Sequence, residues 1–454
     1  MTSTIEIEGF AGQLIEPHDE VYDDARRVWN VLHDRRPALI ARCATATDVA
    51  AALAYARQHD LVVAVRGGGH SLPGFSVCDD GLVVDLGAMN RVDVDAESRR
   101  VTVGGGALLG DVDRAAQRHG LVVPAGVISH TGVGGLTLGG GVGRLMRRFG
   151  LTIDSLLSVD LVTWDGRRLH ASATERPELF WALRGGGGNF GVVTQFEFTA
   201  HPLTDIAVLG AFHPMAELPE VLAIAREVME GDAPDALLWT SFVRKAPSRP
   251  WLPEGREGDL GLTSVIEWSG EPEEGEEVLA ALRSRLGSAD ATVETVPYLM
   301  LQQAGDVEFG HGLMSYVKAT FADSLTDDIV AALVERGSSL GSPLTQIEVL
   351  STGGAIRQVP VDATAFPHRT ASWLLNIPAS WTEPDDTDRE KAWVRETFET
   401  LAPLGTGGAY SNFMEGDEQG GATVAYGDLQ ARLAQVKREY DPHNVFRLNQ
   451  NIVP

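Results

Sequence analysis

Apolar and polar positions alternate along the first 200 residues in a pattern of short strands and helices. Residues 37–70 predict a strand, a helix with an apolar stripe, and a second strand at 61–65 that leads directly into glycines. Thr47 or Asp48 is the expected cap of this helix. Similar segments continue to residue 204, so residues 1–204 are expected to form two small α+β lobes.

The pattern changes after residue 204. Longer strand-like runs, such as 236–244 and 312–321, alternate with acidic amphipathic helices between residues 205 and 405. This alternation predicts an antiparallel sheet flanked by helices on one face, which makes a second domain. Residues 406–454 predict a helix followed by an ordered coil. The expected fold class is therefore α+β.

Charge and cysteine content narrow the possible partners. The 454-residue chain has a formal charge of −26 at pH 7, which repels nucleic-acid phosphates and anionic membranes, so neither is expected as a partner. The two cysteines, Cys43 and Cys78, are too few for a disulfide framework, and no spacing resembles a metal site. Residues 1–20 lack a signal-peptide pattern, and no window has the length of a transmembrane helix. We expect a cytoplasmic monomer or homodimer without a metal.

Four glycine clusters need a physical reason, because glycine in a folded segment costs conformational entropy. They lie at 67–69, 104–106, 132–143 and 185–188. Together they favour an elongated ligand whose phosphates approach the backbone closely. Residues 186–191 match G-x-G-x-x-G, but a helix precedes this stretch and a strand follows it, the reverse of a dinucleotide-binding unit.

Four stretches together resemble one family. They are "VRGGGHSLPG" (65–74), "SHTGVGGLTLGGGVGRLMRRFGLTIDSLLSVDLVTWDG" (129–166), "ELFWALRGGGGNFGVVT" (178–194) and "YDPHNVFRLNQNIVP" (440–454). They look like the FAD-linked oxidases of the vanillyl-alcohol-oxidase superfamily, in the branch of berberine bridge enzyme and 6-hydroxy-D-nicotine oxidase. The resemblance implies a two-subdomain PCMH-type FAD-binding domain at 1–204, a substrate domain at 205–405, and a segment at 406–454 that returns to the FAD-binding domain.

The resemblance also implies a covalent cofactor. His70 matches the histidine that bonds the 8α-methyl group of FAD in this family, and the alternative is a hydrogen-bonded loop histidine. Some members add a cysteinyl bond, but Ile128 stands at that position here, so we expect attachment through His70 only. The other residues that the resemblance assigns to FAD are Arg66, Gly67, Gly68, Gly69, Ser71, Thr131, Gly132, Gly135, Gly140, Gly143, Val193, Asn449 and Asn451.

Candidate substrate residues follow partly from the resemblance and partly from strand alternation. Tyr410 and Asn412 match the family segment that faces the flavin, and Tyr426 and His130 are further catalytic candidates. Each tyrosine has the alternative of a buried residue whose hydroxyl bonds the protein. On the predicted strands of the second domain, Glu348 can reach the substrate face, and Tyr316 and Lys318 share one face.

The expected activity is oxidation of a CH–OH or CH–NH group in a small or medium organic substrate, with O2 as electron acceptor and H2O2 as product. In the nicotine-oxidase branch a second carboxylate follows the position of Glu348, and this chain has Leu350 there, which weakens the case for the same cationic amine. Oxidative cyclisation or dehydrogenation of a secondary metabolite on the same flavin is one alternative. A non-enzymatic flavoprotein is another, because fold and cofactor do not fix function.

Overall fold

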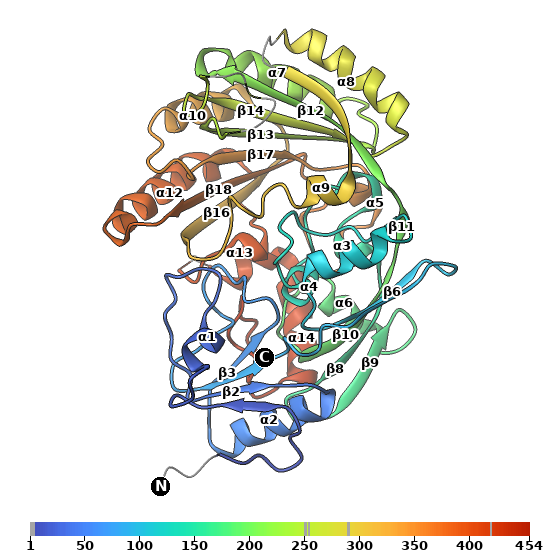
Figure 1. Ribbon diagram of the computed structural model, residues 1–454, viewed down its shortest axis with the longest axis vertical. Helices are drawn as coiled ribbons and strands as arrows, with labels where there is room; N and C mark the ends of the chain where they lie inside the picture. Colours follow the sequence, from blue (N-terminus) through green and yellow to red (C-terminus); the bar gives the residue numbers. More distant parts are fainter. Residues whose placement is uncertain (1–4, 249–251, 253–254, 288–290, 418–419) are drawn as a thin grey trace.

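The N-terminal part of the computed structural model contains a four-stranded and a five-stranded sheet (Figure 1), together with a short pair of strands, β7 (Leu121–Val122) and β11 (His201–Pro202). The described residues are 5–248, 252, 255–287, 291–417 and 420–454. The first sheet has the order β1-β2-β4-β3, formed by β1 (Gln13–Ile15), β2 (Leu39–Arg42), β4 (Leu82–Asp85) and β3 (Val63–Arg66). β2 and β3 both run parallel to β4, and helix α2 (Ala46–Gln58) makes the crossover between them.

Helix α2 begins earlier than the sequence predicts. Thr45 is its N-cap: the Thr45 hydroxyl accepts a hydrogen bond from the Asp48 backbone N–H at 3.3 Å, and the Asp48 carboxylate accepts one from the Thr45 backbone N–H at 2.9 Å. This reciprocal capping box satisfies two backbone donors at once, which is why neither Thr47 nor Asp48 is the cap. The strand after the helix, β3, ends at Arg66, so the chain passes from a strand directly into glycine.

The second sheet is antiparallel throughout and has the order β5-β6-β10-β8-β9. Its last hairpin turns at Asp165-Gly166, with a φ of +85° at Gly166 that favours glycine. Helix α6 precedes the glycines at 185–188 and strand β10 follows them, as the sequence predicts. The elements are β5 (Val92–Asp95), β6 (Arg100–Gly104), α3 (Leu109–Gln117), β8 (Leu156–Val162), β9 (Arg168–Ser172), α6 (Pro177–Leu183) and β10 (Val192–Thr199).

A seven-stranded antiparallel sheet of order β15-β12-β14-β13-β17-β18-β16 forms the upper part of Figure 1. Its strands are β12 (Asp205–Pro214), β13 (Leu237–Lys245), β14 (Leu260–Trp268), β15 (Ala291–Pro297), β16 (Met314–Ala322), β17 (Ile347–Ser351) and β18 (Trp373–Trp381). One face carries tryptophans such as Trp239, Trp373 and Trp381, buried against α7 (Leu218–Glu230), α8 (Pro272–Leu286), α10 (Asp327–Gly337) and α12 (Thr387–Leu401). The other face is left for the cavity described below.

The C-terminal segment packs back onto the N-terminal part. Helices α13 (Ala422–Tyr426) and α14 (Gln430–Tyr440) share a hydrophobic core with α6. The buried ammonium of Lys437 donates to the backbone oxygens of Asn189 and Phe446 and to the carboxylate of Asp441. These bonds tie the last residues of the chain to the glycine loop before β10.

The α+β class and the antiparallel second sheet are confirmed. Within the described ranges, no helix is long and apolar enough to cross a membrane.

Candidate functional site

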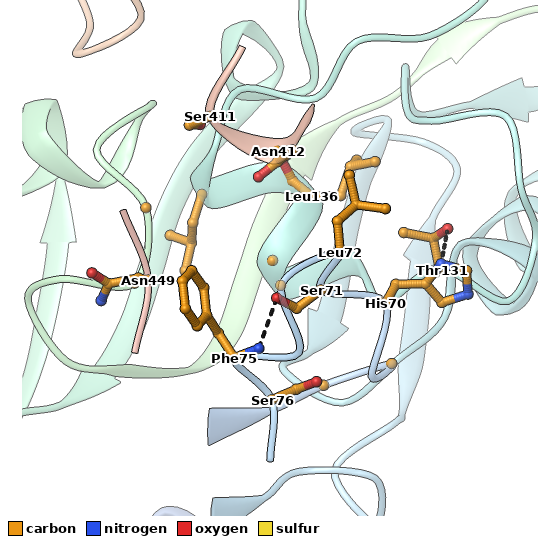
Figure 2. Close-up of a pocket in the computed structure, with 18 of the residues that line it drawn as sticks. His70, Ser71, Leu72, Phe75, Ser76, Thr131, Leu136, Ser411, Asn412 and Asn449 are labelled. Carbon is orange, nitrogen blue, oxygen red and sulfur yellow. Dashed lines mark hydrogen bonds between the residues drawn. The ribbon is translucent and has the colours of Figure 1, made fainter. Parts of the chain in front are cut away.

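A cavity of about 440 Å³ lies between the glycine-rich loops and the open face of the seven-stranded sheet. Residues around 67–76, 126–138 and 187–193 form one side of its wall, and residues of β16, β17 and β18 form another. The C-terminal residues 410–414 and 446–450 complete it. Figure 2 shows how segments far apart in sequence meet there, with His70 beside Thr131, and Asn412 and Asn449 on separate stretches of chain.

The glycines in this wall serve two distinct purposes. Some permit two backbones to touch: a Cβ on Gly68 would collide with the backbone nitrogen of Gly132, and one on Gly132 with that of Gly68. Others open space, because a Cβ on Gly135 or Gly188 would meet no protein atom within 4 Å, although both residues line the cavity. A side chain there would project into room that a ligand needs.

Most of the residues assigned to the cofactor from sequence line this cavity. They are His70, Gly67, Gly68, Gly69, Ser71, Thr131, Gly132, Gly135, Val193 and Asn449. Asn449 donates from Nδ2 to the Phe446 carbonyl at 3.0 Å, while its buried Oδ1 has no hydrogen-bond partner among the described residues. An unpaired buried amide oxygen in the wall is consistent with a ligand that donates to it.

Four assigned residues do not line the cavity, and packing explains three of them. Arg66 forms an ion pair with Asp85 at 3.1 Å and donates to the Ala25 carbonyl. Its guanidinium is therefore paired within the protein and does not face the cavity. Gly140 and Gly143 are sites of close packing: a Cβ on Gly140 would lie 2.9 Å from the Phe366 ring, and one on Gly143 would collide with the Ala125 carbonyl. Asn451 is also absent from the wall, and its Oδ1 is buried without a partner in the described structure.

The imidazole of His70 contacts three side chains, and its burial favours the neutral form. Its Nε2 lies 2.6 Å from His130 Nδ1, and its ring stacks on Trp29 with 5.0 Å between centroids. Its other nitrogen, Nδ1, lies 3.5 Å from the Thr131 hydroxyl (Figure 2). Burial, reinforced by the neighbouring His130 and His311, lowers the pKa of His70 to about 3. His130 contacts His70 and is not part of the cavity wall, which corrects its assignment as a residue facing substrate.

Tyr410, Asn412 and Tyr426 reach the wall, but their polar atoms bond the protein. The Tyr410 hydroxyl accepts hydrogen bonds from the backbone N–H of Gly141 at 3.0 Å and from Asn412 Nδ2 at 2.9 Å. The Tyr426 hydroxyl donates to the Gly186 carbonyl at 3.2 Å. Burial raises the pKa of both tyrosines. Their geometry assigns them to holding the glycine loops in place.

A carboxyl group occupies the sheet side of the cavity. Glu348 on β17 accepts hydrogen bonds from Gln346 Nε2 at 2.6 Å and from Asn376 Nδ2 at 2.9 Å. Burial raises the pKa of Glu348, while the two amide hydrogen bonds and the Arg244 charge oppose the rise. Among the described residues of the wall, Glu348 is the only Asp, Glu, Lys or Arg.

Asn376 is a wall residue that the sequence analysis missed. It lies opposite Glu348 in the register of β17 and β18, and its buried Oδ1 has no partner in the described ranges. The alternation of residues 373–381 signals a strand, but only the long-range register brings this asparagine to Glu348. Glu348 and Asn376 thus lie side by side in the same part of the cavity wall.

Tyr316 and Lys318 share a strand face, as expected, but it is the helix-covered face. Ser315 and Val317 on the same strand line the cavity, so the intervening side chains point away from it. The Tyr316 hydroxyl donates to the Asp417 carboxylate at 2.9 Å, and Lys318 Nζ lies 3.7 Å from the same carboxylate. Neither residue belongs to the substrate side of the cavity.

Comparison with known proteins identifies the ligand class. A family model described as "FAD binding domain" matches residues 37–172, and one described as "Berberine and berberine like" matches residues 409–453. The (R)-6-hydroxynicotine oxidase of Paenarthrobacter nicotinovorans is 32% identical over 460 residues, covering 98% of this chain and 97% of that protein. An FAD-linked oxidoreductase of Dictyostelium discoideum is 31% identical over 440 residues, covering 96% and 93%.

The fold agrees with these matches. The crystal structure of 6-hydroxy-D-nicotine oxidase from Arthrobacter nicotinovorans has a TM-score of 0.84 to this chain at 28% identity, and each chain is covered completely. The resemblance inferred from the glycine motifs is therefore confirmed. The open space beside Gly135 and Gly188 and the unpaired Asn449 oxygen fit FAD, the ligand that the matching family model and the Dictyostelium relative name.

A large side chain in the open space beside Gly135 should abolish FAD binding without unfolding the protein. Gly135→Leu places a large side chain in the cavity, whereas Gly135→Ala adds a Cβ that meets no protein atom. The leucine variant is expected to lose nearly all FAD, measured as absorbance at flavin wavelengths per chain, while the alanine variant keeps most of it. Circular dichroism checks that both are folded. Equal FAD content in folded leucine and alanine variants contradicts the assignment of this space to the cofactor.

Proposed function

This chain belongs to the berberine bridge enzyme-like family of FAD-linked oxidoreductases, and from that premise we propose that it is a covalent-flavin oxidase. It removes a hydride and a proton from a CH–OH or CH–NH group of a small or medium organic substrate and delivers the electrons to O2, forming H2O2. The placement of Glu348 in the cavity wall supports this proposal most directly.

The cofactor is held by backbone and by one covalent bond. The glycines at 67–69 and 132–135 provide the close backbone approach that a diphosphate requires, since no lysine or arginine of the described chain lines the wall. His70 is the attachment point because its neutral ring has one nitrogen bonded to His130 and the other beside the wall residue Thr131. When bound, FAD supplies the hydride acceptor and the route for electrons to O2.

The substrate is oriented by two acceptors. Glu348 takes the proton from the substrate O–H or N–H as hydride leaves the adjacent carbon, because a carboxylate in hydrogen-bond reach lowers the barrier to that transfer. The free oxygen of Asn376 accepts a second hydrogen bond from the substrate. With no cation in the described wall and one carboxylate, the cavity favours neutral or cationic substrates that bear hydroxyl or amine donors, and disfavours carboxylates and phosphates. A substrate screen read by peroxide release, restricted first to this class, tests the assignment.

The covalent bond is expected at His70 alone. Acid denaturation should leave yellow, fluorescent flavin in the protein pellet of the wild type and release all of it from His70→Ala. The control is Cys43→Ser/Cys78→Ser, which should keep the adduct. Both thiols are buried outside the cavity wall, and burial raises the pKa of Cys78 to about 11. Free FAD from the wild type, or an adduct in His70→Ala, contradicts the assignment.

Loss of the Glu348 carboxylate should slow substrate oxidation while the protein stays folded. Glu348→Gln keeps the size of the side chain, and we expect anaerobic flavin reduction to fall by about 100- to 10,000-fold, the usual contribution of a general base. In the wild type the rate should rise with pH as Glu348 loses its proton, with a kinetic pKa above that of an ordinary glutamate, because burial raises the pKa of this group.

Gln346→Leu is the matched variant that tests whether the rise of the rate with pH comes from Glu348. It removes a hydrogen bond to the charged form, so the kinetic pKa should move further upward while the rate at high pH stays near the wild-type value. If Glu348→Gln reduces its flavin at the wild-type rate, or if its rate still rises with pH as in the wild type, another group takes the proton.

Thr131 is expected to leave room for O2 beside the flavin. An added side chain that overfills a packed site costs about 1–3 kcal/mol. If O2 must displace it to reach the flavin, Thr131→Leu should slow reoxidation roughly 5- to 160-fold. Thr131→Val, of similar volume to the wild type, is the control and should reoxidise normally. Stopped-flow mixing of photoreduced protein with aerated buffer gives the rate. Wild-type reoxidation over minutes, with preference for a dye acceptor, indicates a dehydrogenase instead.

A further inference from the structure

Three histidines lead from the covalent attachment point to the protein surface. His70 Nε2 and His130 Nδ1 are 2.6 Å apart, and the rings of His130 and His311 have centroids 4.9 Å apart. One nitrogen from each ring lies within 4.8 Å of the others. His70 and His130 are half-buried and His311 is exposed, so the series ends in solvent.

The hydrogen bond between the first two rings determines which nitrogen of His70 can react. A neutral imidazole has one N–H and one lone pair, and the hydrogen bond made by one nitrogen selects the tautomer. The arrangement in which His130 Nδ1 accepts from His70 Nε2–H places the lone pair of His70 on Nδ1, next to the wall residue Thr131. Stacking on Trp29 keeps the ring in this orientation.

We propose that His130 is a positioning residue for cofactor attachment: it holds the Nε2–H tautomer of His70 and accepts that proton as His70 Nδ1 bonds the 8α carbon of FAD. The exposed ring of His311 lies between His130 and solvent. This inference rests on the proposed covalent attachment at His70. It extends that proposal by naming the group that activates the histidine.

The chemistry balances with O2 as the oxidant. The C8α–Nδ1 bond forms as one C–H bond of the 8α-methyl group breaks, and the electron pair of that C–H bond goes to the isoalloxazine ring. The methyl proton and the Nε2 proton are both released, and the reduced ring takes up protons from solvent. Molecular oxygen then removes the two electrons and two protons as H2O2. The product is oxidised flavin bonded to Nδ1 of a neutral imidazole whose Nε2 carries a lone pair.

The surroundings suit His130 to this role. Its other ring nitrogen, Nε2, is buried without a hydrogen-bond partner in the described part of the chain, so no hydrogen bond on that side fixes the tautomer of His130. Burial and the neighbouring His311 lower the pKa of His130, whereas the charge of Asp306 raises it and stabilises the protonated form. Asp306 is itself fixed by the backbone N–H of Ser129 at 2.8 Å.

Spacing alone would also suit a metal ion bound by three histidines, but the contact between His70 and His130 disfavours it. At 2.6 Å the two nitrogens share a proton, and a metal ligand must present its nitrogen lone pair to the metal instead. The geometry therefore favours proton transfer between these rings.

Variants at His130 test the proposal through the covalent fraction of FAD, which does not depend on turnover. His130→Asn keeps a hydrogen-bond acceptor but no base, and His130→Gly leaves space for free imidazole. Each full-length variant is purified and precipitated in acid, and flavin in pellet and supernatant is compared; His119→Asn, an exposed histidine outside the cluster, is the control. We expect normal total FAD in all variants, complete attachment in wild type and control, and attachment about 100-fold slower in both His130 variants.

Rescue separates proton transfer from a purely structural role. Incubation of aerated His130→Gly with imidazole should increase the covalent fraction with time, and incubation with benzene, a ring of similar size without a base, should not. Complete attachment in His130→Asn and His130→Gly overturns the role of His130 while leaving the covalent flavin intact. Slow attachment in His130→Gly that imidazole does not restore also overturns proton transfer. Dissociable FAD in the wild type overturns both this inference and the proposed covalent attachment.

Discussion

The contact between the backbones of Gly68 and Gly132 is the constraint on which the site depends. No residue with a Cβ can occupy either position without moving the other loop. This contact joins the loop after β3 to the loop before α4 (Val133–Leu138), and it brings His70 beside His130 and Thr131. A closely packed interior transmits a displacement of this kind, so enlarging either glycine would shift the reactive imidazole as well.

The second constraint is the difference between the two faces of the seven-stranded sheet. Tryptophans and aliphatic residues bury one face beneath four helices, and that face supplies the hydrophobic stability of the domain. The other face carries Ser315, Glu348 and Asn376 toward the cavity, where buried polar atoms need partners. Gln346 and Asn376 are the hydrogen-bond partners of Glu348, and the side-chain oxygen of Asn376 has no partner among the described residues.

Local patterns predicted much of the fold and the cofactor side of the site. The glycine motifs predicted the loops of the cavity wall, and the helix before residues 185–188 and the strand after them were also predicted, because these features depend on neighbours in sequence. The residues that the seven-stranded sheet contributes to the cavity were predicted less well, because their positions depend on the pairing of strands far apart in sequence. Alternation paired Tyr316 with Lys318 but could not tell which face the helices cover, and Asn376 acquires its role only by lying opposite Glu348. His311 joins His130 across 181 positions, a contact with no local signal.

A crystal structure of the protein with FAD and a bound substrate or product tests the central claim most directly, namely that one cavity holds a flavin on His70 with its reactive ring next to Glu348. The account predicts continuous electron density from His70 Nδ1 to the flavin, and a substrate donor within hydrogen-bond distance of Glu348 and of the Asn376 side-chain oxygen. Flavin density separate from His70, or a substrate that contacts neither Glu348 nor Asn376, would contradict it.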